Sequence, residues 1–192
     1  ALRYQHKPNK AFTFGAGLHA KPVGLMTQLV QVADAQGELR RPNERLGFSR
    51  AVHAVLGYEH MIATDLRFKA EVYHQYLFDM PMENDPRSSY SESNTVEWFT
   101  DRALVNEGVG YNNGVELCLE KFFTKGYHFL VTASMSDTRY KPLDRNWYNG
   151  RFNLGVVANA LGGKEWKLNA AKEKDRVLMA GMRYSVQGGQ YN

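Results

Sequence analysis

The sequence predicts an all-β protein, built as an antiparallel up-and-down meander of about seven strands. Apolar and polar residues alternate with a period of two along seven segments, as they do in half-buried strands. No window keeps an apolar i, i+3, i+4, i+7 stripe through three helical turns. The 17 glycines and the aromatic content of 12% also favour strands and tight turns over helices.

Each predicted strand has one aliphatic face and one face of polar or small residues, because successive side chains of a strand point to opposite sides. The segments are 12–18, 52–58, 66–72, 115–119, 127–135, 152–160 and 178–186. Charged and amide side chains on the second face are Arg67, Lys69, Glu71, Glu116, Glu120, Asn153 and Arg183. This pattern fits a soluble sheet with one wet face, and it equally fits a barrel wall with lipid outside and a polar lumen inside.

The connections between the strands favour the barrel wall. Short links at 58–66, 122–127 and 168–176 alternate with long polar links at about 20–49, 80–112 and 138–150. Long structureless loops are uncommon in compact soluble domains, whereas outer-membrane barrels alternate short periplasmic turns with long extracellular loops. Aromatic residues near the strand ends also fit interfacial girdles.

Composition and strand count further limit the classes of protein that fit the sequence. The net charge of +4 comes from scattered residues, so we expect no nucleic-acid partner. Single-chain bacterial barrels have an even number of strands, from eight upwards, and seven is odd. We therefore expect residues 1–192 to be a single partial barrel domain.

A resemblance to a known family covers most of residues 11–186 and is most specific between residues 106 and 166. The residues that carry it are Asn106-Glu107-Gly108, Gly110, Asn113-Gly114-Val115-Glu116-Leu117, Leu119-Glu120-Lys121-Phe122-Phe123, Lys125-Gly126-Tyr127 and Ala160-Leu161-Gly162-Gly163-Lys164-Glu165-Trp166. They resemble the later part of the barrel in TonB-dependent outer-membrane receptors with an N-terminal carboxypeptidase-regulatory-like domain. The strand from Leu66 to Tyr76 is similar as well.

The resemblance implies a 22-stranded transmembrane β-barrel closed by a plug, of which this chain would be one section, without the plug and the remaining strands. It implies uptake of a scarce ligand across the outer membrane of a Gram-negative bacterium. The implied partners are outer-membrane lipids and the TonB–ExbB–ExbD complex, which would act through the N-terminal part that this chain lacks. The seven polar-face residues named above would then face the lumen.

Ligand contacts are expected on the long loops, because loops on a rigid scaffold commonly carry recognition. In the link 80–112 the candidates are Tyr90, Trp98, Phe99 and Arg102. Their mixture of aromatic rings and charge suits a small polar organic ligand or a surface lipoprotein lid, and it equally suits a loop that packs on itself.

No motif for catalysis, a cofactor or a metal is present, so we expect no enzyme. The six histidines form no His-Glu-x-x-His or His-x-x-x-His spacing, and His19 is the best single candidate for a site assembled from loops. Cys118 is the only cysteine and is expected to fill space in the wall. Two alternatives stay open: a soluble antiparallel β-sheet binding module, and a barrel used for adhesion or export.

Overall fold

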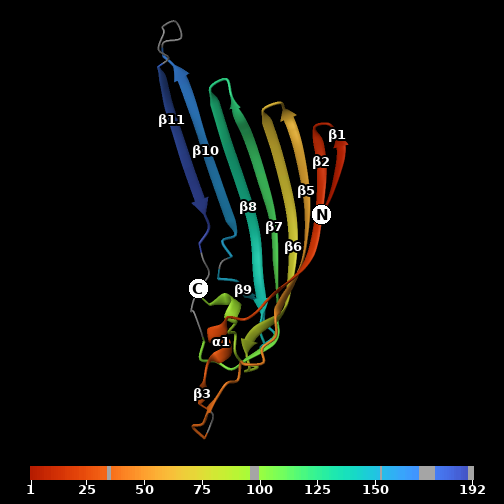
Figure 1. Cartoon of the computed structure of the whole chain (residues 1–192), viewed down its shortest axis with the longest axis vertical. Helices are drawn as coiled ribbons and strands as arrows, with labels where there is room; N and C mark the ends of the chain where they lie inside the picture. The colour runs from red at the N-terminus through yellow and green to blue at the C-terminus, as the bar shows by residue number, and fades with distance from the viewer. Residues whose placement is uncertain (34–35, 96–99, 152, 169–175, 190–192) are drawn as a thin grey trace.

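The computed structural model describes residues 1–33, 36–95, 100–151, 153–168 and 176–189. These residues form a nine-stranded antiparallel sheet in the order β1-β2-β5-β6-β7-β8-β10-β11, with β9 paired to β8. Figure 1 shows the strands side by side in sequence order, each running opposite to its neighbours. The predicted all-β, up-and-down antiparallel fold is confirmed.

Seven long strands correspond to the seven alternating segments. They are β2 (Lys10–Lys21), β5 (Ser49–Ala63), β6 (Leu66–Glu83), β7 (Leu104–Thr124), β8 (Tyr127–Lys141), β10 (Val156–Lys167) and β11 (Val177–Gln187). Most run beyond their predicted limits, and β7 reaches 21 residues. Backbone pairing therefore continues past the point where the alternation of apolar side chains fades.

Four short strands and two short helices complete the fold. The strands are β1 (Leu2–Lys7), β3 (Val32–Ala33), β4 (Leu39–Arg40) and β9 (Tyr148–Asn149). The helices are α1 (Leu25–Leu29) and the 3-10 turn η1 (Glu92–Asn94). β1 was not predicted, because its six residues alternate too briefly to stand out.

The segment 152–160 needs a correction at its start. β10 begins only at Val156, so Asn153 lies in the loop before the strand. The Asn153 amide donates a hydrogen bond to the Gly150 carbonyl at 2.9 Å, and Gly155 has a φ of +67°. A turn and a left-handed residue both interrupt an extended backbone, which sequence alternation does not reveal.

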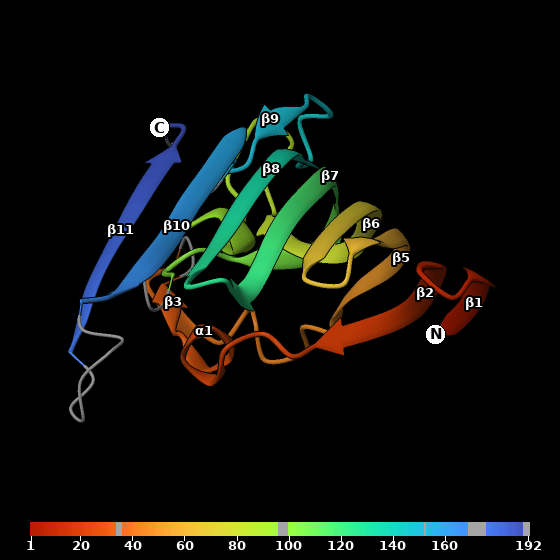
Figure 2. The ribbon, with the colours of Figure 1, turned by 90° about the horizontal axis from the view of Figure 1, so that it is seen from above.

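Short turns and long loops lie at opposite ends of the sheet, as predicted (Figure 1). At the short-turn end, β7 and β8 are joined through Lys125 (φ +51°) and Gly126 (φ +79°), two left-handed residues that suit a tight hairpin. At the other end, residues 22–48, 84–103 and 142–155 form the long connections. Viewed from above, the sheet is curved, with α1 and β3 on its concave side and β9 at the end of β8 (Figure 2).

Buried apolar side chains are concentrated at the loop end, where Val23, Met80, Met82 and Leu104 are enclosed. Along the body of the sheet the aliphatic face stays exposed: Leu56 is 56% exposed, Val72 53% and Met135 57%. Monomeric soluble proteins rarely leave so continuous an apolar surface uncovered. No helix among the described residues is long and apolar enough to cross a membrane.

Candidate functional site

The polar face of the sheet carries a charged band in its middle section. Strand pairing sets Arg67 opposite Glu120 and Glu71 opposite Glu116, and cross-strand partners share a face. The Arg67 guanidinium lies 2.5 Å from the Glu120 carboxylate, and the Lys69 ammonium lies 2.8 Å from Glu71. The structure thus brings these five candidates onto one face.

Of the other two residues predicted on the polar face, Arg183 lies on that face and Asn153 does not lie on a strand. Arg183 is paired with Leu161, whose own partner Leu130 is paired with Glu120, so Arg183 shares the face of the charged band. Asn153 is not part of the band, because it lies in the loop before β10, where its side-chain amide is 3.4 Å from the Asp137 carboxylate. Cys118 is opposite Lys69 on the same face and is half-buried.

The long loops fold into a cap, defined here as residues 22–48, 84–103 and 142–155 in their described part. Asn43, which is fully buried, joins two of these loops. Its amide donates to the carbonyls of Thr27 (3.1 Å) and Arg102 (2.9 Å), and its oxygen accepts from the Leu104 amide at 2.8 Å. Three hydrogen bonds from one side chain hold the cap together at this point.

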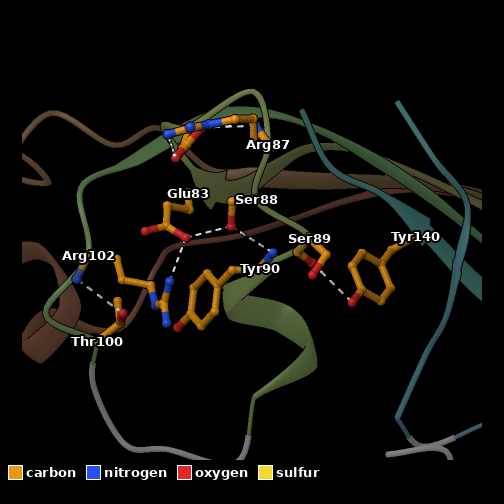
Figure 3. Close-up of polar contacts among 9 residues, drawn as sticks. Glu83, Arg87, Ser88, Ser89, Tyr90, Thr100, Arg102 and Tyr140 are labelled. Atoms are coloured by element: carbon orange, nitrogen blue, oxygen red, sulfur yellow. Dashed lines mark hydrogen bonds and ion pairs between the residues drawn. The ribbon is translucent and has the colours of Figure 1, made fainter. Parts of the chain in front are cut away.

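Two predicted ligand-contact residues meet inside the cap. The Arg102 guanidinium stacks over the Tyr90 ring, with its central carbon 4.5 Å from the ring centroid, and its Nη1 lies 2.5 Å from the Glu83 carboxylate. Ser88 donates to the same carboxylate at 2.5 Å and accepts from the Tyr90 amide at 3.1 Å. Figure 3 shows Arg102 and Ser88 both bonded to Glu83, with the Tyr90 ring beside Arg102.

A third segment joins the cap through Tyr140, near the end of β8. Its hydroxyl donates to the Ser89 carbonyl at 3.2 Å (Figure 3), and the Asn94 side chain lies 3.4 Å from the same hydroxyl. The Asn94 oxygen in turn accepts a hydrogen bond from the Arg151 amide at 2.5 Å. Trp98 and Phe99, the other two predicted contact residues, lie outside the described residues.

His19 lies on the polar face beneath the cap. Its ring stacks on His53, with centroids 4.4 Å apart and planes 15° apart. A cavity of about 510 Å3 opens here, between His19 and Gln75 on the sheet and Glu92 and Thr95 on the cap. Within the described ranges, no three His, Cys, Asp or Glu side chains are grouped so that they could hold a metal ion.

Carboxylates in the turns and in the cap have lowered pKa values. Hydrogen bonds from the side chains of Lys121 and Thr124 hold the pKa of Asp65 below its ordinary value. In the cap, a hydrogen bond from Arg87 lowers the pKa of Asp85, and one from the Tyr148 hydroxyl lowers that of Asp144. All three groups are therefore ionised at neutral pH.

Several residues that build this site were not among the site residues predicted from the sequence. Asn43 stands in the run Arg41-Pro42-Asn43-Glu44, which is typical of an exposed loop. Glu83 is the last residue of β6, beyond the clear alternation, and Tyr140 lies similarly late in β8. A signal that could have found Glu83 and Tyr140 is strand length, because 18 and 15 residues carry the ends of β6 and β8 into the loop region.

The fold defines a class: an antiparallel meander with one polar and one aliphatic face, short turns at one end and an ordered cap at the other. No known protein family and no curated protein matches the sequence. Among solved structures, the fold is similar to that of the FrpB iron transporter from Neisseria meningitidis, with a TM-score of 0.53 and 15% sequence identity. The match covers 94% of this chain and 30% of that one, so the chain spans about a third of the transporter's length. At this identity the likeness shows the fold alone.

Proposed function

We propose that the chain is a section of the wall and extracellular cap of a TonB-dependent receptor in the outer membrane of a Gram-negative bacterium. The whole protein would take up a scarce small ligand, with energy from the TonB–ExbB–ExbD complex. Outer-membrane lipids would cover the aliphatic face, and the charged band would face the lumen. The proposal includes no catalytic step and no resident cofactor.

One observation carries the proposal: the cap closes over the polar face, while the aliphatic face stays bare along the sheet. In a soluble sheet the aliphatic side is the side that needs covering, because burial of apolar area is the main driving force of folding. Here Glu92 and Thr95 of the cap instead enclose a cavity with His19 and Gln75 of the polar face. That arrangement is expected where lipid covers the other side.

The resemblance in residues 106–166 and the likeness to an iron transporter add support to a transport role. They do not define the ligand chemistry, and a surface lipoprotein remains one partner that the exposed cap would fit. The principal alternative is a soluble β-sheet binding module, which would need a partner surface to cover the aliphatic face.

Arginine substitutions in the whole protein test which face meets lipid. Leu117 and Val131 are exposed on the aliphatic face, and Ser134 is on the polar face opposite Glu116. An arginine near the bilayer midplane costs about 2–4 kcal/mol when it faces lipid. We expect Leu117→Arg and Val131→Arg to reduce the amount of assembled protein in the outer membrane sharply.

The matched control is Ser134→Arg, which should assemble normally because its side chain would point away from lipid. Equal tolerance of all three substitutions, measured by blotting membrane fractions, would contradict the assignment of the faces. Loss of assembly in all three would contradict it as well.

A further inference from the structure

A second, smaller cavity lies inside the cap, where residues 88–95 meet the end of β8 and the loop before β10. Its volume is about 320 Å3. Hydrogen-bond donors dominate its wall, which includes Ser88, Ser91, Asn94, Arg102, Tyr140 and Arg151. No carboxylate is among the described residues that line it. A cavity of this size is at the lower limit for a small-molecule site.

Arg102 is held in place on one side of this cavity. Its contacts with Glu83 and with the Tyr90 ring fix the guanidinium plane. The Glu83 carboxylate accepts one hydrogen bond from Nη1 of Arg102, and a guanidinium has five N–H donors in all. Donors therefore remain for a group that enters the cavity.

Arg151 adds a second positive charge on the other side. Its backbone amide is anchored by the Asn94 side chain at 2.5 Å, and the residue is half-buried. In the described part of the chain, its guanidinium forms no ion pair. Glu83 offsets the charge of Arg102. No carboxylate among the described lining residues offsets the charge of Arg151, so the cavity has an excess of positive charge.

Ser91 supplies an independent observation. The residue is only 3% exposed, and its hydroxyl is buried without a hydrogen-bond partner among the described residues. A buried hydroxyl without a partner is costly, and most such groups in folded proteins are satisfied by protein, water or ligand. Because Ser91 lines the cavity, a group bound there is a candidate partner for this hydroxyl.

We propose that this cavity binds the oxyanion group, a carboxylate or phosphate, of a small soluble ligand. Guanidinium groups pair with both oxyanions through charge-assisted and often bidentate hydrogen bonds. Tyr140 is paired with Gly110 and shares the polar face, so the cavity is on the side away from the proposed lipid surface. The inference rests on the proposed function, because it names a ligand class for the cap of the receptor. Binding of an anion can nevertheless be measured without transport.

Calorimetric titration of the purified whole protein in detergent tests the site, with succinate, inorganic phosphate and glucose as probes. We expect at least one of the two anions to bind, more weakly at high ionic strength, and glucose not to bind. Arg151→Gln should weaken anion binding about ten-fold or more, because it removes a charged hydrogen-bond donor. The control is Arg87→Gln, since Arg87 also lies in the cap but is almost fully exposed and paired with Asp85.

The Ser91→Ala variant tests the binding site without disturbing the folded structure. Its hydroxyl bonds to no described residue, so we expect an unchanged melting temperature without ligand and an anion affinity lowered about three- to ten-fold. Absence of anion binding by the folded protein would overturn the proposal, and so would binding that neither Arg151→Gln nor Ser91→Ala weakens. Glucose binding of equal strength would replace it with a neutral sugar site.

The two proposals fail separately. Normal outer-membrane assembly and the expected arginine pattern, with no anion binding, would overturn the oxyanion site alone. Anion binding that depends on Arg151, in a protein found outside the outer membrane, would overturn the receptor and leave the site standing.

Discussion

Asn43 shows how strongly the cap depends on single buried side chains. One amide group satisfies three backbone groups, two in the loops and one at the start of β7, and the residue has no exposed surface. Removing it leaves buried donors and acceptors unpaired, which costs about 1–3 kcal/mol for each group. The cap is therefore held by specific polar contacts in addition to its small apolar cluster.

We expect Asn43→Ala to loosen the cap while the strands stay paired. Limited proteolysis of the whole protein should then cleave within residues 22–48 and 84–103 much faster than in the wild type. Glu44→Ala is the control, because Glu44 makes only a weak surface ion pair with Arg45 at 3.9 Å. Equal cleavage of both variants would contradict the role assigned to Asn43.

Asp65 plays a comparable part at the short turns. It contacts Lys121 and Thr124 and so links the β5–β6 turn to the end of β7. Because its pKa is lowered in the folded protein, its contribution to stability is complete above the ordinary value of 3.8. That contribution is lost as the pH falls through the lower folded-state pKa.

The stability difference between wild type and Asp65→Asn should therefore be largest near neutral pH and shrink in strong acid. Thermal unfolding in detergent across this pH range measures it. The Asp65→Asn variant cannot ionise at this position, so a difference that stays constant with pH would show that the carboxylate charge is not what stabilises the turns.

At the residue scale, the sequence could predict chemistry but not contacts. Tyr90 and Arg102 were named for their aromatic ring and charge, and they are found stacked on each other. Their partner Glu83 could not be predicted, because its position depends on how far β6 continues and where the loop turns back. The cavity that we propose for an oxyanion depends on two loops meeting the end of β8, which no local pattern encodes.

At the scale of elements, strands were predictable because pairing demands a period of two along every long segment. Two strand predictions were incomplete for local reasons. β1 was missed because it is short, and β10 starts later than predicted because of the turn at Asn153 and the left-handed Gly155. Pairing registers came only from the structure, since alternation defines which side a residue faces but not its partner.

The β7–β8 turn offers a test at this scale. Gly126 is left-handed, and a Cβ at this position would lie 2.9 Å from the Glu165 carbonyl oxygen. Gly126→Val should destabilise the hairpin by at least about 1–2 kcal/mol, seen as a lower urea midpoint in detergent. Lys125→Gly is the contrasting change: it relieves a left-handed lysine and should not lower the midpoint.

At the scale of the whole molecule, the two faces and the two ends have opposite characters. The aliphatic face is bare and the polar face is capped, while the turns are short at one end and the loops are long at the other. The edge strands β1 and β11 each pair with one neighbour among the described residues, which leaves a row of backbone groups open to further strands. A section of a larger closed barrel accounts for all of these features together.

The location of the native protein in fractionated cells is the decisive measurement. Samples blotted with and without heating show whether the protein is a folded barrel, because such barrels migrate faster before heating than after. We expect a heat-modifiable band in the outer-membrane fraction, well above the 21.9 kDa of this chain. A band near 21.9 kDa in the soluble fraction would contradict the receptor and favour a soluble β-sheet binding module.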